Sequence, residues 1–203
     1  LFNPKIHYFK DKIVFGFLGT FGPWHGTDLL VESFAKACEI SPDFRINAHL
    51  IMIGDGVKKD DSFYLARELG IIQKTTFTGL VNQANAPRYL ANCDVLICPT
   101  LPNPDGSDFF GSPVKIFEYL AMGKPIIASS LGQIPEFIEH GVNGFLVEPG
   151  NSEALTRMLL YCEKNSKNSK RLKNIGLKAR ELAETKCTWK HHVDKILAGV
   201  DAV

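Results

Sequence analysis

Six short segments rich in apolar residues recur along the chain, and amphipathic segments separate them. The runs do not alternate between apolar and polar positions, as a strand with one exposed face would. Uninterrupted apolar runs of this length are typical of strands that are buried on both faces of a parallel sheet. The predicted strands span 12–20, 45–56, 75–81, 94–100, 124–129 and 143–149.

Between these runs, apolar residues recur at helical spacing. In the segment 25–40, for example, they gather on one side of the predicted helix and charged residues gather on the other. The predicted helices span 25–40, 62–71, 85–93, 112–122, 134–141 and, with a break near 164–169, 151–200.

The regular alternation of strand and helix predicts the fold class. It favours an α/β fold, with a Rossmann-like, doubly wound, six-stranded parallel sheet followed by C-terminal helices. No internal repeat or second domain boundary interrupts the pattern, so residues 1–203 are expected to form one domain. Ligands of such sheets bind beside the carboxyl ends of the strands. The predicted strand ends are 19–26, 54–57, 78–82, 99–111 and 129–133.

Composition narrows the range of partners. The formal net charge is +1, which gives no support for a partner attracted by bulk charge, such as nucleic acid or a membrane surface. No apolar run has the length of a membrane span. The five cysteines are scattered, which favours reduced thiols and a cytoplasmic location. The chain does not begin with Met, so we expect it to be a fragment of a longer protein.

The segment FFGSPVKIFEYLAMGKPIIAS, residues 109–129, predicts an anion-binding helix N-terminus. Ser112 is a favourable N-cap, and Pro113 is favourable at the first helical position. Gly111 allows a ligand to approach the backbone closely. The free N–H groups and the helix dipole together favour a bound anion.

Lys115 and Glu118 are three residues apart and therefore share one face of this predicted helix. The helix dipole disfavours a cation in the first turn, where Lys115 lies, unless an anion binds there. The simpler interpretation is an exposed Lys–Glu pair on a capped helix.

The same segment resembles the donor-nucleotide segment of GT-B glycosyltransferases, specifically the family 4-like, group 1 retaining enzymes. Other segments resemble that family in the same order, so the resemblance covers essentially the whole chain. They are FLGTFGPWHGTDLLVESF (17–34), LIMIGDG (50–56), FTGLV (77–81), LANCDVLICPT (90–100), GVNGFLVEPGN (141–151) and TWKHHVDKIL (188–197).

The resemblance implies a role for each matching residue. Glu118 accepts hydrogen bonds from the ribose hydroxyls of the donor, and Val81 meets the base through its main chain. The first Gly-rich turn and the start of the helix hold the diphosphate. The implied substrate-binding residues are Gly19, Thr20, His25, Val81, Gly111, Ser112, Pro113, Val114, Lys115 and Glu118.

This sequence departs from the family pattern at the acidic pair and at the first turn. The family often has two acidic residues with seven between them, but the position that matches the first is Phe110. Asp108 is the candidate for this catalytic, sugar-contacting role, and a simple loop residue is the alternative. Many members carry Arg and Lys where this chain has Thr20 and His25. We expect His25 to assist the diphosphate best as a cation, with a core or capping role as the alternative.

The expected function is glycosyl transfer, with retention, from a nucleoside-diphosphate sugar to an unknown acceptor. The resemblance implies that no metal or other cofactor is needed and that this chain is the donor-binding half. An N-terminal acceptor-binding domain would be the missing partner, and the isolated domain would be inactive. The closing helix near Trp189 is expected to lean away from the core, towards that domain.

Three alternatives remain open at this point: a sugar-nucleotide epimerase of the same fold, a non-catalytic nucleotide-binding module, and a dinucleotide-dependent dehydrogenase. The dehydrogenase ranks last, because GTFGPWHG lacks the spacing of a Gly-x-Gly-x-x-Gly turn.

Overall fold

The computed structural model describes residues 9, 11–107, 109, 114–166 and 170–200. Its centre is a sheet of six parallel strands in the order β3-β2-β1-β4-β5-β6. This is the strand order of a Rossmann-like fold, so the predicted fold class is confirmed. The strands are β1 (Ile13–Leu18), β2 (Ala48–Ile53), β3 (Thr75–Phe77), β4 (Val95–Cys98), β5 (Ile126–Ser129) and β6 (Phe145–Val147).

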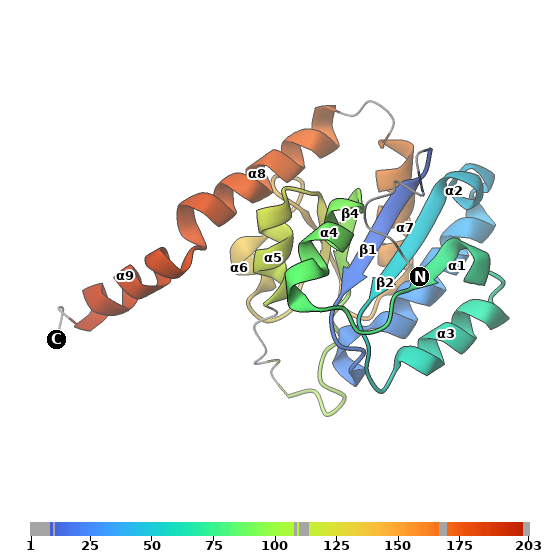
Figure 1. Cartoon of the computed structure of the whole chain (residues 1–203), viewed down its shortest axis with the longest axis horizontal. Helices are drawn as coiled ribbons and strands as arrows, with labels where there is room; N and C mark the ends of the chain where they lie inside the picture. The colour runs from blue at the N-terminus through green and yellow to red at the C-terminus, as the bar shows by residue number, and fades with distance from the viewer. Residues whose placement is uncertain (1–8, 10, 108, 110–113, 167–169, 201–203) are drawn as a thin grey trace.

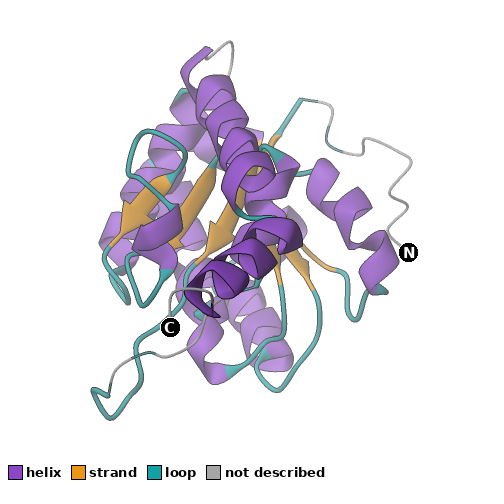
Figure 2. Cartoon of the chain, turned by 90° about the vertical axis from the view of Figure 1, so that its left-hand side faces the viewer, coloured by secondary structure: helices purple, strands orange, loops and turns teal. Residues whose placement is uncertain are grey.

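Helices cover both faces of the sheet (Figure 2). Alternate side chains of each strand point to opposite faces, so two separate apolar clusters form. Phe15 and Phe17 belong to the cluster that is covered by α1 (Thr27–Ile40) and α7 (Ser152–Lys164). Val14 belongs to the other cluster. That second cluster is covered by α4 (Ala86–Ala91), α5 (Lys115–Met122), α6 (Ile134–Phe137) and α8 (Lys170–Lys186).

The remaining helices are short or peripheral. They are α2 (Pro42–Asn47), α3 (Lys59–Glu68), α9 (Trp189–Val200) and the 3-10 turns η1 (Pro23–His25), η2 (Ile72–Lys74) and η3 (Gln83–Asn85).

The expected strand 45–56 begins too early. Residues 42–47 form α2, because Ser41 accepts a hydrogen bond from the Phe44 N–H (3.1 Å) and Pro42 occupies the first turn. The strand starts only at Ala48.

The expected helix 134–141 is too long, because it ends at Phe137. The Asn143 side chain replaces the helical hydrogen bonds beyond that point. Its amide nitrogen donates to the Phe137 carbonyl (2.8 Å), and its amide oxygen accepts from the Glu139 N–H (2.7 Å). The expected helix 112–122 is described from Lys115 onwards; residues 112 and 113 lie outside the described residues.

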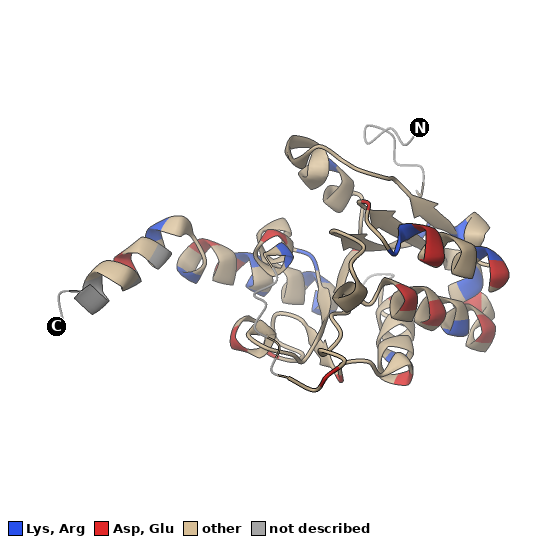
Figure 3. Cartoon of the chain, turned by 90° about the horizontal axis from the view of Figure 1, so that it is seen from below, with Lys and Arg blue, Asp and Glu red and all other residues tan. Residues whose placement is uncertain are grey.

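The C-terminal helices α8 and α9 run outward from the sheet, and α9 lies farthest from it (Figure 1). The α9 helix therefore leans away from the core as expected, and Trp189 at its start is 83% exposed. Positively and negatively charged residues are interspersed along the ribbon of the helices (Figure 3), in keeping with the small net charge. No helix among the described residues combines the length and apolar character that a membrane crossing requires.

Candidate functional site

A cleft of about 340 Å³ opens at the carboxyl ends of β1 and β4. These neighbouring strands lead to opposite faces of the sheet, since β1 continues into α1 and β4 leads to α5. Such a switch point is where open α/β sheets bind ligands. The cleft is lined by Leu18, Gly19, Thr20, Trp24, His25, Thr100, Phe109, Val114, Lys115 and Glu118.

The turn after β1 is packed directly onto the end of β4. Gly26 has a φ of 62°, a left-handed conformation that favours glycine. A Cβ atom at this position would lie 1.9 Å from the Pro99 carbonyl oxygen, so no other residue fits without rearrangement. The Leu101 N–H also donates to the Trp24 carbonyl (2.9 Å). The turn after β1 and the end of β4, which form two sides of the cleft, are therefore held close together.

Lys115 reaches from α5 across the cleft to the turn after β1. A Cβ atom built on Gly19 would lie 2.6 Å from the Lys115 Nζ atom, so the glycine leaves the space that the ammonium occupies. The same nitrogen lies 4.5 Å from the centre of the Phe17 ring. Lys115 forms no ion pair with any carboxylate in the described part of the chain.

Burial lowers the pKa of Lys115, although Cys98 and Glu118 partly oppose the shift. Loss of hydration disfavours the charged form of the ammonium, and a bound anion would restore the lost stabilisation. The first turn of α5 thus offers a cation that forms no ion pair with the residues that the structure describes.

The surroundings of His25 favour the neutral imidazole in the unliganded protein, and its expected role as a cation beside a diphosphate stays a prediction. Burial, followed by the charge of Lys115, lowers the pKa of His25 to about 4. The Gly22 N–H donates to the His25 Nδ1 atom (3.2 Å), and the Thr20 hydroxyl lies 3.3 Å from the same nitrogen. Because Nδ1 accepts a hydrogen bond, the proton of the neutral ring is assigned to Nε2. His25 can therefore donate one hydrogen bond from Nε2 without a positive charge.

Glu118 also lines the cleft, one turn of α5 beyond Lys115. Its side chain is half-buried and has no hydrogen-bond or ion-pair partner among the described residues. Burial raises the pKa of Glu118, and the charge of Lys115 partly opposes this shift. The simpler interpretation, an exposed Lys115–Glu118 ion pair, therefore does not hold, and the carboxylate is available to accept hydrogen bonds from a ligand.

Tyr119, the next residue along α5, fixes the position of this helix. Its buried hydroxyl accepts a hydrogen bond from the Leu18 N–H (2.8 Å) and lies 3.3 Å from the Ile97 carbonyl oxygen. Tyr119 thus joins α5 to the ends of β1 and β4. The sequence prediction did not include this role; the signal for it is a hydroxyl on the buried face of an otherwise apolar helix.

The structure brings together six of the predicted site residues and adds others. Gly19, Thr20, His25, Val114, Lys115 and Glu118 all line the cleft. Val81 follows β3 and is not part of the lining; it packs against the apolar cluster on the α5 face of the sheet. Asp108, Gly111, Ser112 and Pro113 lie outside the described residues. The lining residues that sequence reasoning missed are Leu18, Trp24, Thr100 and Phe109.

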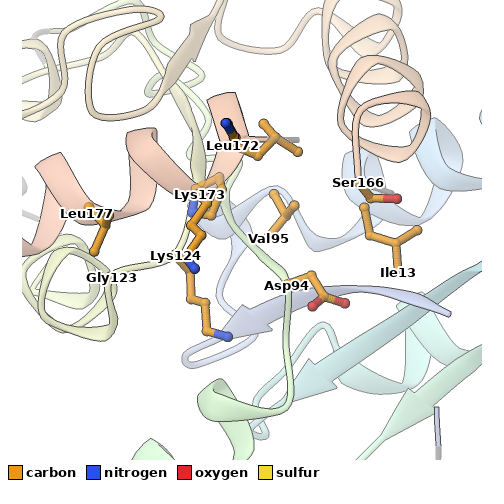
Figure 4. Close-up of a pocket in the computed structure, with 11 residues that line it drawn as sticks. Ile13, Asp94, Val95, Gly123, Lys124, Ser166, Leu172, Lys173 and Leu177 are labelled. Atoms are coloured by element: carbon orange, nitrogen blue, oxygen red, sulfur yellow. The ribbon is translucent and has the colours of Figure 1, made fainter. Parts of the chain in front are cut away.

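A larger cavity, of about 560 Å³, lies at the opposite edge of the sheet, where β1, β4 and β5 begin. Figure 4 shows Asp94, Lys124 and Lys173 around it. The Asp94 carboxylate accepts a hydrogen bond from the Val14 N–H (2.8 Å) and so supports the start of β1. Ligands of this fold class bind at the other edge, and none of the predicted site residues lies here.

Among the described residues, no three His, Cys, Asp or Glu side chains are grouped so that they could hold a metal ion.

These observations define a Rossmann-like α/β domain whose cleft presents the Lys115 ammonium, the His25 imidazole and the Glu118 carboxylate. The chain belongs to the glycosyl transferases group 1 family, whose sequence model matches residues 2–179. It is 29% identical to an uncharacterized glycosyltransferase of Methanocaldococcus jannaschii, over 76% of this chain and 36% of that protein.

Solved structures agree with the fold. A structure of Anabaena HepE in complex with UDP is 25% identical, with a TM-score of 0.78 over 95% of this chain and 50% of that one. The C-terminal domain of a group 1 family glycosyl transferase from Francisella tularensis shares the fold, with a TM-score of 0.69, 21% identity and 87% of each chain covered. The chain thus spans about half the length of HepE and about a third of the archaeal relative.

Proposed function

We propose that the cleft binds a nucleoside-diphosphate sugar and that this chain is the donor-binding half of a retaining glycosyltransferase. The observation that carries the proposal is that Lys115 and Glu118 lie on one face of α5 in the cleft and that neither forms an ion pair with the described residues. A diphosphate is stabilised by a positive charge such as the Lys115 ammonium. The vicinal hydroxyls of a ribose are bound well by an acceptor such as the Glu118 carboxylate. The UDP in the HepE structure supports this choice of ligand.

Each side chain then has a role in binding or in leaving-group departure. Transfer breaks the bond between the anomeric carbon and a phosphate oxygen, and negative charge develops on that oxygen. Lys115 and the Nε2–H of His25 would stabilise this charge, and the Thr20 hydroxyl would add a neutral hydrogen bond. Gly19 allows the diphosphate to approach the backbone of the β1 turn.

The other predicted positions complete the proposed site. Val81 would meet the base through its main chain, and the backbone of residues 111–114 would hold phosphate oxygens at the start of α5. Because Lys115 supplies the positive charge, we propose that donor binding needs no divalent metal.

The acceptor site belongs, in this proposal, to a second domain. The chain spans only half of HepE, which supports a two-domain enzyme. The isolated chain is therefore expected to bind a donor without transferring its sugar.

Calorimetric titration tests the proposal. The chain is titrated with UDP, GDP and ADP, each in the presence and absence of EDTA, and then with the matching sugar nucleotides. We expect one of the three diphosphates to bind at a single site, with an affinity that EDTA leaves unchanged. Failure of all three to bind would contradict donor binding, and loss of binding with EDTA would contradict metal independence.

Asp108 remains a prediction, because it lies outside the described residues. If it contacts the donor sugar, Asp108→Ala should weaken binding of the intact sugar nucleotide more than binding of the bare diphosphate. Equal losses for the two ligands in the same calorimetric titration would leave Asp108 as a loop residue.

A further inference from the structure

Trp24 is an unexpectedly exposed aromatic residue at the candidate site. It lies in η1, a turn without any buried residue, and its side chain is 51% exposed. The indole lines the same cleft as Lys115 and Glu118. Exposure of a large apolar side chain to water is unfavourable, and an indole in a cleft that also holds Lys115 and Glu118 offers an apolar face to a ligand.

The indole packs against two neighbours, Gly22 and His25, in the absence of ligand. A Cβ atom on Gly22 would lie 3.4 Å from the Cζ2 atom and 3.5 Å from the Cε2 atom of Trp24, so the indole rests over this glycine. The centre of the indole lies 5.6 Å from the His25 ring. The Trp24 carbonyl accepts the hydrogen bond from Leu101. A ring fixed in this way can contact a ligand with little further loss of entropy.

The order of residues around the cleft indicates which part of the donor meets Trp24. In the proposed function, Glu118 holds the ribose, and Lys115 and His25 hold the phosphates. Trp24 lies next to His25 and is joined to the loop after β4, whereas the base is assigned to Val81 after β3. The strands β3 and β4 are separated by β2 and β1. The group nearest Trp24 is therefore the one on the far side of the phosphates from the ribose, which is the sugar.

We propose that the indole of Trp24 is a platform for the sugar of the donor and that it favours sugar nucleotides over bare nucleoside diphosphates. This inference rests on the proposed function. The C–H groups on the face of a pyranose ring can pack on an aromatic face, whereas the phosphates cannot. Trp24 would thus be a specificity-determining residue and not a group that takes part in bond breaking.

The test uses the fact that the chain contains only two tryptophans, Trp24 and Trp189. In the Trp189→Phe variant, fluorescence reports on Trp24 alone. UDP, UDP-glucose and UDP-N-acetylglucosamine are added in turn, and quenching by acrylamide is measured. We expect at least one of the two sugar nucleotides to shield Trp24 from acrylamide more than UDP does. Equal shielding by all three ligands would contradict a sugar contact.

Affinities measured by calorimetry give a second readout. An aromatic contact of about 0.5–1.5 kcal/mol corresponds to a change in affinity of roughly two- to tenfold. Trp24→Ala should lower the affinity for the sugar nucleotide by this factor and change the affinity for UDP by no more than about twofold. Trp24→Phe should keep most of the affinity for the sugar nucleotide. Trp189→Ala is the matched control, since this exposed tryptophan lies in α9, and it should change neither affinity.

The outcomes separate the two proposals. If UDP and the sugar nucleotide lose affinity equally in Trp24→Ala, or if neither does, the sugar platform is refuted while donor binding stands. If the unaltered chain binds none of the three uridine ligands, the uridine donor is refuted, and the same comparison with GDP or ADP and the matching sugar nucleotides then decides the platform by the same criteria.

Discussion

Replacing Glu118 by Gln separates ligand binding from folding. The carboxylate lines the cleft and forms no hydrogen bond or ion pair with the described residues, so the substitution breaks no such bond among them. Gln keeps the shape of the side chain but loses the charge and one accepting oxygen. A hydrogen bond to a charged group contributes about 1.5–3 kcal/mol, so affinity for the nucleoside diphosphate should fall roughly ten- to a hundredfold.

Glu118→Gln should weaken ligand binding but should not lower the stability of the folded chain. Because burial raises the pKa of Glu118, the ionised form is disfavoured in the folded state. The contribution of this carboxyl group to stability is therefore present at low pH and lost as pH rises through its folded pKa. Near pH 7, Gln removes this unfavourable ionisation, so the melting temperature should stay constant or rise.

Calorimetric titration and a thermal melt of the same variant test both statements. Glu32→Gln is a suitable control, since Glu32 is an exposed acid on α1 that does not line the cleft. An unchanged affinity in Glu118→Gln, with an intact melt, would refute the assignment of Glu118 to the ribose. A marked fall in melting temperature would refute the claim that its carboxylate is unpartnered.

The remaining predictions concern the cation, the imidazole and the turn after β1. Lys115→Met should weaken diphosphate binding by about 1.5–3 kcal/mol and reduce the dependence of affinity on salt, without loss of melting temperature; an unchanged salt dependence would count against the proposed phosphate contact. His25→Ala should weaken diphosphate binding by the same factor at every pH from 6.5 to 8, because the low pKa leaves the imidazole neutral there. A loss of affinity that grows towards pH 6.5 would show instead that His25 binds the diphosphate as a cation. Gly26→Ala should cost at least about 1 kcal/mol more in unfolding free energy than Gly70→Ala, since both positions are left-handed but only the first meets the Pro99 carbonyl. If urea unfolding gives the same loss of unfolding free energy for both variants, the close approach of Gly26 to the Pro99 carbonyl does not affect stability.

The fold was predictable because the central strands β1, β4 and β5 are buried almost completely. That environment demands the apolar runs from which these strands were predicted, whereas the partly buried edge strand β3 carries two Thr residues. The boundaries were less predictable, because single polar side chains set them. Asn143 ends α6 through hydrogen bonds to residues that the helical pattern would have included. Ser41 starts a helix inside a segment whose composition resembles a strand.

The site was predictable where a residue acts through its position in a motif. Lys115 and Glu118 share a helix face by spacing alone, and the structure places both in the cleft. The protonation of His25 was not predictable, because it depends on burial and on Lys115, ninety residues away in sequence. Trp24 was missed for a similar reason: only the folded turn shows that its indole is exposed inside the cleft.

The central claim is that the cleft at the carboxyl ends of β1 and β4, and not the larger cavity at the opposite edge, binds a nucleoside diphosphate. Backbone amide NMR of the isotope-labelled chain, titrated with UDP, GDP and ADP, tests it most directly. We predict that the diphosphate that binds shifts the amide signals of Gly19, Thr20, His25 and Lys115, while those of Asp94 and Lys124 stay in place. Shifts confined to Asp94, Lys124 and their neighbours, or no shifts with any of the three ligands, would contradict the claim.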